Sequence, residues 1–311
     1  MKVSDSVKGY LLALVSVIAI SNVYIFSKVA LKEVSLPQFG AYWFGFGLLW
    51  ILLFAWYRRS FSIFKDLSGR CYLVLILLGI FEVIGTYFFF KAIDTISNPT
   101  IVSFIGNISP AFIITLSFFV LKERFNSLEF WGIILALSGA FIISYKNNAG
   151  IEDMFIDGAQ YVLYSSILGA INAVIIKKKI EKIHPIILTI SRSLFLLIFS
   201  IIALSYVQET WLISTNALKN IFIGSLLGPF LTVIAGYLAL QYIPLSNKAI
   251  IASTRGLFVL LGSYLYFGEF PEIIALIGGF VTIIGVLFIA FGKMRIQKEK
   301  MTKMIKKTET I

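Results

Sequence analysis

The feature that most constrains this chain is a series of ten long apolar runs, which short polar stretches separate. They lie at residues 9–31, 37–57, 71–91, 97–121, 127–145, 155–176, 185–207, 216–240, 247–267 and 271–292. A helix needs about 20 apolar residues to cross the hydrocarbon core of a bilayer, and each run is long enough. Because lipid offers no hydrogen-bond partners, the backbone of each run must bond within its own helix or to a neighbour. We therefore expect an all-α integral membrane protein with ten transmembrane helices.

The composition argues against several classes of protein. Hydrophobic residues make up 59% of the chain, which is too many for a surface in water. The single cysteine, Cys71, cannot supply a disulfide or a cysteine metal cluster, and the single histidine, His184, argues against a histidine-ligated metal site. We expect no metal and no cofactor. Much of the net charge of +11 comes from the C-terminal tail, which we interpret as an anchor at an anionic membrane surface rather than as a nucleic-acid site.

The distribution of Lys and Arg predicts the orientation of the chain. If the N-terminus is cytoplasmic, 20 of the 27 Lys and Arg residues lie on that side and four lie on the other. Such an excess is typical of cytoplasmic loops. The first run follows Lys2 and Lys8 but is longer than a signal-peptide core and lacks a small-residue cleavage site, so we interpret it as a retained span. We expect a multi-pass protein of the cell (plasma) membrane with both termini in the cytoplasm.

An internal repeat divides the sequence into two halves of five spans each. Two patterns recur: Asn22, Lys28 and Pro37 match Asn172, Lys178 and Pro185, and Glu123, Gly132 and Gly139 match Glu269, Gly278 and Gly285 at a constant offset of 146. We expect one five-helix unit at 1–146, a second at 154–293 and a basic tail at 294–311. Because five is odd, the second half enters the membrane in the opposite orientation. Inverted repeats of this kind are typical of secondary transporters, which bind their solute between the halves.

A doubled motif runs through the second part of each half. Its members are Ala92, Pro110, Glu123, Gly132 and Gly139, repeated as Ala239, Gly256, Glu269, Gly278 and Gly285. With this motif the chain resembles the drug/metabolite transporter superfamily, specifically its EamA-type family of ten-helix proteins. The resemblance implies a solute carrier, often an exporter of amino acids or related metabolites, with a central cavity lined by the first, third, fourth, sixth, eighth and ninth spans. The chain departs from the pattern at Gly256, which stands where the first half has Pro110, and at 42–44, where three aromatic residues replace a frequent arginine.

Glu82 is the most informative single residue, because it lies near the middle of the third span. A charged carboxylate at that depth costs about 2.5–3.5 kcal/mol, so it should face the bundle interior and be either protonated or paired. Two interpretations fit this position. Glu82 either couples proton movement to transport or balances a substrate ammonium, or it is a structural cross-link between helices.

Three basic residues also lie within the spans. Arg255, in the ninth span, either binds a substrate carboxylate, pairs with Glu82, or extends its side chain to the inner interface. Arg192, in the seventh span, and Lys28, at the outer end of the first, are expected to reach the membrane interface.

Small and polar residues form stripes along one face of the fourth and eighth spans, namely Thr100, Ser103, Asn107 and Pro110, and Ser225, Pro229, Thr232 and Gly236. Such stripes either line a cavity or pack helices together, and the sequence leaves both open. The Gly224–Gly228 pair indicates close helix packing rather than a dimer interface. Pro110 and Pro229 remove intrahelical hydrogen bonds and predict kinks where gates flex.

Glu123 and Glu269 end the fourth and ninth spans and suggest capping or gating. Besides Glu82 and Arg255, the candidates for substrate binding or coupling are Asn22, Asn107, Asn172, Ser103, Thr232, Tyr87, Tyr164 and Tyr237.

The sequence therefore favours a carrier over an enzyme or a channel. A membrane-embedded transferase with Glu82 as its base would need a second positioned group. A passive channel would need rings of like residues along a pore. We expect a secondary active transporter, an exporter of a small organic solute, that is not an enzyme, with the transferase and the channel as alternatives. Its expected partners are that solute, the lipid bilayer and protons as coupling ion, with no nucleic acid, in a monomer or homodimer.

Overall fold

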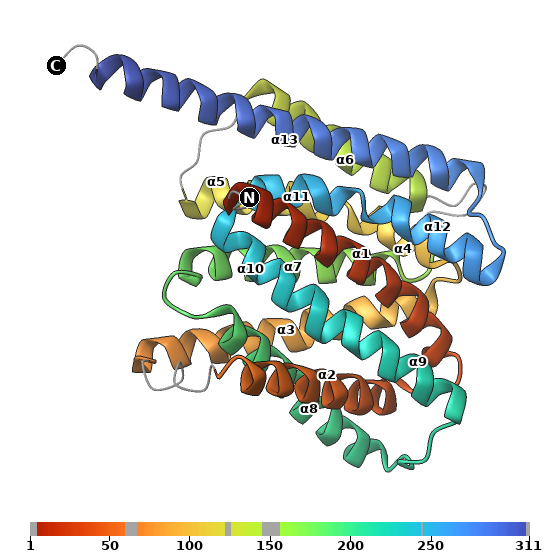
Figure 1. The fold of residues 1–311 in the computed structure, drawn as a ribbon. Coiled ribbons are helices and arrows are strands. Elements are labelled where there is room, and N and C mark those ends of the chain that lie inside the picture. Colours follow the sequence, from red (N-terminus) through yellow and green to blue (C-terminus); the bar gives the residue numbers. More distant parts are fainter. Residues whose placement is uncertain (1–4, 60–66, 122–125, 145–155, 244, 309–311) are drawn as a thin grey trace.

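A computed structural model describes residues 5–59, 67–121, 126–144, 156–243 and 245–308. Every regular element in these ranges is a helix, which confirms the predicted all-α fold (Figure 1). In chain order the helices are α1 (Asp5–Leu31), α2 (Leu36–Tyr57), α3 (Gly69–Thr95), α4 (Pro99–Gly106), α5 (Ser109–Leu121), α6 (Ser127–Ser144), α7 (Ala159–Lys179), α8 (Pro185–Val207), α9 (Thr215–Ser225), η3 (Leu226–Thr232), α10 (Val233–Tyr242), α11 (Leu245–Ser253), α12 (Arg255–Phe267) and α13 (Ile273–Thr308).

The helices correspond to the ten predicted spans. Six are long and apolar enough to cross a membrane, namely α1, α2, α3, α7, α8 and the continuous segment Thr215–Tyr242. Four shorter apolar stretches, at Pro99–Ile113, Ser127–Ile143, Arg255–Phe267 and Ile273–Ile289, belong to the other four spans.

Local sequence explains where several helices begin. Ser35 accepts a hydrogen bond from the Gln38 backbone, and the Gln38 side chain bonds back to the Ser35 N–H, which forms a capping box at α2. The Asn98 side chain accepts the Thr100 N–H at the start of α4, and the His184 ring accepts the Ile186 N–H at the start of α8. A proline stands at the first or second position of all three helices, where its missing N–H costs nothing.

The two halves pack against each other in a symmetric pattern. If the spans are numbered in chain order, the first packs on the eighth and the third on the sixth, while the second, fourth and fifth each pack on their own counterpart in the other half. Exchanging the halves turns the first–eighth contact into the sixth–third contact and leaves the other three unchanged. This is the contact pattern expected of a repeat related by a pseudo-two-fold axis.

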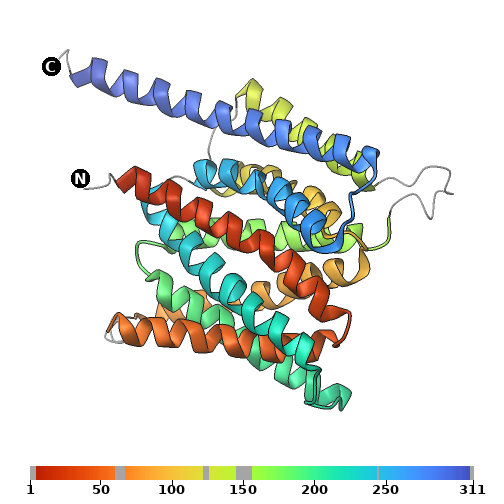
Figure 2. The ribbon, with the colours of Figure 1, turned by 45° about the vertical axis from the view of Figure 1, so that its right-hand side comes forward.

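The repeated glycines lie where α6 and α13 pack side by side, along one edge of the molecule (Figures 1 and 2). A Cβ atom added at Gly132 would lie 2.6 Å from the carbonyl oxygen of Gly285, and one added at Gly139 would lie 2.6 Å from that of Gly278. Only glycine allows the backbones to approach this closely. The two glycine pairs of the repeated motif therefore form one helix–helix contact between the halves.

The Gly224–Gly228 pair packs against a side chain instead of a helix backbone. Both glycines face the indole of Trp43, and a Cβ added at Gly228 would lie 2.9 Å from its Cζ2 atom. Trp43 is almost fully buried in the largest hydrophobic cluster of the described residues. The two glycines of the eighth span therefore leave the space that the Trp43 indole of the second span fills.

Three spans are irregular near their middle. The fourth divides into α4 and α5 just before Pro110, which has no N–H to donate to the Gly106 carbonyl. The eighth contains the π-helix η3 around Pro229, and the ninth divides into α11 and α12 at Thr254. The irregular sites of the fourth and eighth spans thus lie at Pro110 and Pro229, whereas the break at Thr254 has no proline beside it.

The last helix is longer than predicted. α13 has 36 residues and continues to Thr308, so the backbone of the predicted tail at 294–311 is helical for most of its length. Both figures show it extending beyond the bundle at the same end as the N-terminus. The two termini therefore lie at one end of the molecule, as the even number of spans requires.

Candidate functional site

A polar cavity lies between the two halves of the bundle. Its cavity volume is about 230 Å³, and it opens to the outside of the bundle. Its lining comes from both halves and consists of Ile20, Tyr24, Phe81, Glu82, Gly85, Thr86, Phe89, Val102, Gly106, Ser109, Val162, Ser165, Ser166, Gly169, Asn172, Arg192 and Arg255.

The cavity differs from the implied layout in one respect. The first, third, fourth, sixth and ninth spans line it as expected, but the seventh span contributes Arg192. Among the described residues that line it, none comes from the eighth span. The eighth span packs against α1 and α2 instead.

Glu82 is the middle residue of the 27-residue α3 and forms an ion pair with Arg192 of α8. The Arg192 Nε donates to Glu82 Oε2 at 2.8 Å, and Arg192 Nη2 lies 3.2 Å from the Thr86 hydroxyl. Thr86 in turn lies 3.4 Å from Glu82 Oε2, so three side chains form a closed triangle. The expectation that Arg192 extends to the interface is wrong, because its guanidinium pairs with the half-buried Glu82 carboxylate instead.

A second, smaller cavity adjoins this ion pair. Glu82 and Arg192 line both cavities, and the buried Tyr237 of α10 lines only the smaller one. Tyr237, proposed as a binding residue, therefore lies behind the ion pair and away from the main cavity.

Arg255 does not pair with Glu82. Its Nη2 lies 3.4 Å from the Asn107 side-chain oxygen, and its guanidinium lies over the Tyr24 ring at 5.7 Å from the centroid. Space for it comes from Gly106, where an added Cβ would lie 3.2 Å from Nη2. Arg255 is the first residue of α12 and Asn107 follows α4, so the breaks of the fourth and ninth spans meet at the cavity.

Asn172 also lines the cavity, from the sixth span. It is only 4% exposed, and its side-chain oxygen has no hydrogen-bond partner in the described part of the chain. A buried amide oxygen without a partner costs about 1–3 kcal/mol, which a ligand that donates to it would offset.

Several other predicted residues lie outside this cavity. Ser103 is buried and donates to the Thr100 carbonyl, while Thr232 donates to Leu227 and so bonds the carbonyl five residues before it in η3. Asn22 donates to the Ile18 carbonyl of its own helix. Tyr164 is 48% exposed and packs on Phe88. Glu269 is exposed after α12, and Glu123 lies outside the described residues.

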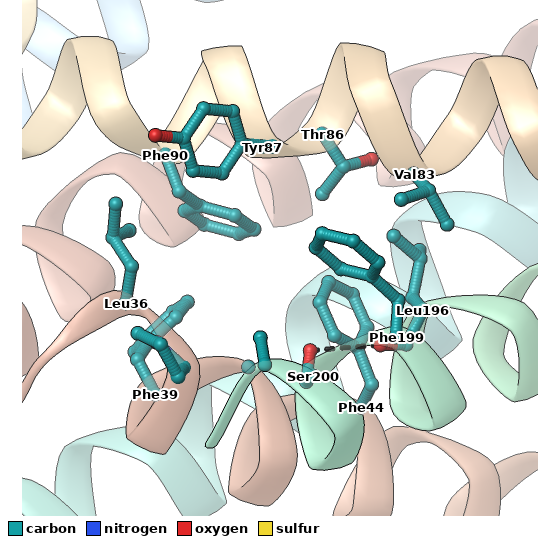
Figure 3. A pocket seen from close by; sticks show the side chains of 13 residues that line it. Leu36, Phe39, Phe44, Val83, Thr86, Tyr87, Phe90, Leu196, Phe199 and Ser200 are labelled. Carbon is teal, nitrogen blue, oxygen red and sulfur yellow. Dashed lines mark hydrogen bonds between the residues drawn. The ribbon is translucent and has the colours of Figure 1, made fainter. Parts of the chain in front are cut away.

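Tyr87 lines a separate apolar pocket of about 110 Å³ between α2, α3 and α8 (Figure 3). The Ser200 hydroxyl in this pocket is already bonded to the Leu196 carbonyl. Thr86 lines this pocket and the polar cavity as well, so it stands in the wall between them.

Lys28 is buried instead of reaching the membrane interface, and its side chain caps the C-terminal end of α3. Its Nζ donates to the backbone carbonyls of Ile93, Asp94 and Ile96 at 2.8–2.9 Å. In the second half, Lys177 donates to the Leu240 carbonyl of α10 at 3.0 Å. The structural counterpart of Lys28 is thus Lys177, one residue before the Lys178 that the sequence pattern selected.

Sequence reasoning missed Tyr24, Thr86 and the role of Arg192. A charged residue in the middle of a span was a sufficient signal for Arg192. Nothing distinguished Tyr24 among the 14 tyrosines of the chain. The described residues contain no group of three or more His, Cys, Asp or Glu that would hold a metal ion.

Comparisons with known proteins agree with this architecture. The sequence profile of the EamA-like transporter family matches residues 7–145 and again residues 157–291. An uncharacterized transporter of Archaeoglobus fulgidus is 30% identical over 112 residues, which cover 36% of this chain and 39% of that protein. An uncharacterized transporter of Synechocystis sp. is 25% identical over 214 residues, 57% of this chain and 60% of the other. The matches thus span less than two thirds of either relative.

A solved crystal structure shares the fold. It superposes with a TM-score of 0.63 over 90% of this chain and 95% of its own, at 14% sequence identity.

Proposed function

Because the chain belongs to the EamA-like transporter family, we propose that it carries a small organic solute, an amino acid or related metabolite, across the cell membrane by alternating access. The observation that carries this proposal is the polar cavity between the halves, which side chains of both halves line. A solute bound there touches both halves, so a relative movement of the halves would change the side from which it is reached.

The irregular spans support such a movement. Helix breaks at Asn107 and Thr254 lie where the fourth and ninth spans pack together, and η3 interrupts the eighth. Backbone that departs from a regular helix absorbs changes in φ and ψ more readily than a continuous helix does. We place the hinges at these breaks.

We propose a proton as the coupling ion and Glu82 as its carrier. Protonation of Glu82 would remove the charge that holds Arg192, since the two groups form an ion pair at 2.8 Å. The released guanidinium would then face the cavity, so the protonation state of Glu82 would alter the charge that the solute meets. The proposed direction is export from the cytoplasm, as in the family exporters that the chain resembles.

Counterflow in proteoliposomes tests the proposal. Vesicles preloaded with an unlabelled amino acid or metabolite should transiently accumulate the labelled compound above equilibrium, because the unlabelled solute inside competes with the label for exit on the same carrier. Vesicles with only equilibrating flux would indicate a channel. No flux across a broad panel of amino acids and metabolites would contradict the transporter.

A further inference from the structure

We propose that Arg255 binds a carboxylate of the transported solute, so that the substrate is an organic acid or an amino acid rather than an amine or a neutral compound. This inference rests on the proposed transport function and names the chemistry of its substrate. Arg255, Asn172 and Tyr24 carry it.

The charges of the cavity do not balance. Glu82 and Arg192 neutralise each other at 2.8 Å. Arg255 is the only other charged residue in the lining, and no carboxylate lies within ion-pair distance of it among the described residues. The lining therefore has an excess of one positive charge. A charge in this depth of a membrane needs compensation, and a bound anion would supply it.

The Arg255 guanidinium also has unused hydrogen-bond donors. It has five N–H groups in a planar fork, which matches the two oxygens of a carboxylate. Within the described residues its side chain makes one long bond, to Asn107 at 3.4 Å, and its buried Nε has no partner. The face of Tyr24 fixes the plane of the guanidinium without using any N–H group.

The surroundings of Arg255 offer the solute a second contact. Asn172, which lines the same cavity and is 4% exposed, offers an oxygen without a partner to a donor on the remainder of the solute.

Ligand-induced thermal stabilisation of the purified full-length protein tests this inference independently of transport. The probes are L-amino acids and short monocarboxylic acids, compared with their amides and with the corresponding amines, each at about 10 mM, which exceeds usual substrate affinities. A ligand that binds the folded state raises the melting temperature. We expect at least one acid to do so, while its amide and amine do not.

Substitutions then test whether the Arg255 side chain is responsible for acid binding. In Arg255→Gln the acid should bind about 10- to 100-fold more weakly, as expected for a lost charged hydrogen bond. Arg255→Lys keeps the charge and should retain part of the affinity. Lys178→Gln is the matched control, since it removes one positive charge from an exposed site outside the cavity and should bind the acid normally.

Three results would overturn the inference. The first is equal stabilisation by acids, amides and amines, and the second is the absence of stabilisation by any acid. The third is unchanged acid binding in an Arg255→Gln protein that elutes as a folded species. If acids bind through Arg255 but no counterflow occurs, the anion site stands and the proposed transport fails.

Discussion

The ion pair between Glu82 and Arg192 shows what sequence can and cannot provide for a single residue. The cost of a carboxylate in the middle of a span predicts that Glu82 is either neutral or paired. The partner lies 110 positions away in the chain, and its identity depends on how α3 and α8 pack. Two arginines at similar depth were available, and only the fold distinguishes Arg192 from Arg255.

The substitution Glu82→Gln distinguishes a role of Glu82 in proton coupling from a role as a structural cross-link between helices. The variant keeps the shape of the side chain and a hydrogen-bond acceptor for Arg192, but it cannot exchange a proton. If Glu82 is the coupling group, proton-driven accumulation in proteoliposomes should be lost while solute exchange persists. Wild-type, pH-dependent accumulation by Glu82→Gln would leave only the cross-linking role.

The Glu82–Arg192 ion pair also predicts how single and double substitutions change the stability of the protein. Glu82→Leu leaves the Arg192 charge uncompensated and should cost about 3–5 kcal/mol, whereas Glu82→Leu combined with Arg192→Met should recover much of the loss. Thermal melting of the purified variants measures both. Equal melting temperatures for the single and double variants would show that the two charges do not depend on each other.

His184 predicts a pH dependence outside the membrane-spanning segments. Its Nδ1 accepts the Ile186 N–H at the start of α8. Burial, together with the nearby Arg58, lowers the pKa of His184 below its usual 6.5. The unfolded chain therefore takes up a proton at a higher pH than the folded chain does, so His184 reduces stability as the pH falls from 6.5 through the folded pKa.

The melting temperature of the wild type should accordingly decrease over that pH range. His184→Asn keeps a side-chain oxygen at the cap position but does not titrate, so this part of the decrease should disappear. Identical pH profiles for the two proteins would show that other groups dominate.

At the scale of helices, the sequence predicts the spans well and their interruptions in part. Apolar length locates the ten spans, and Pro110 and Pro229 mark two of the three irregular sites. The break at Thr254 has a different cause, because the Thr254 hydroxyl donates to the Ile251 carbonyl and so competes with the regular helix bond. Gly256 then packs closely on Phe104 of α4, which a larger residue would prevent.

Lys28 and Lys177 cap the C-terminal ends of equivalent helices in the two halves. This predicts how much stability is lost when each of three lysines is replaced. Lys28→Met should lower stability by about 1–3 kcal/mol, because the carbonyls of Ile93, Asp94 and Ile96 lose their donor at the end of α3. Lys177→Met should have a smaller effect, since it removes one such bond.

Lys178→Met is the control, because Lys178 is exposed and is the residue that the sequence repeat alone would select. Thermal melting of the three variants provides the ranking. A loss for Lys178→Met equal to that for Lys177→Met would contradict the structural assignment.

For the whole molecule, the repeat makes the inverted architecture predictable, while the contacts between its halves come only from the fold. At the end of the bundle where the α1–α2 and α8–α9 connections lie, Glu33 accepts hydrogen bonds from Ser214 and Asn216, and Ser35 donates to Glu209. These bonds from Ser214 and Asn216 lower the pKa of Glu33 below its usual 4.5, so Glu33 stays charged at neutral pH. Exposed contacts of this kind contribute little stability individually, and they are easily broken.

Because these hydrogen bonds join the two halves, they should break when the halves move apart at this end. In a Cys71→Ser background, which removes the only native thiol, Glu33→Cys and Ser214→Cys can be joined by a short, reducible bifunctional thiol reagent. The cross-linked protein should lose counterflow because this end of the bundle can no longer open, and reduction should restore it. Each single-cysteine variant, treated with the same reagent, should transport as before treatment. Full counterflow by the cross-linked protein would show that the halves exchange access to the cavity without separating at this end.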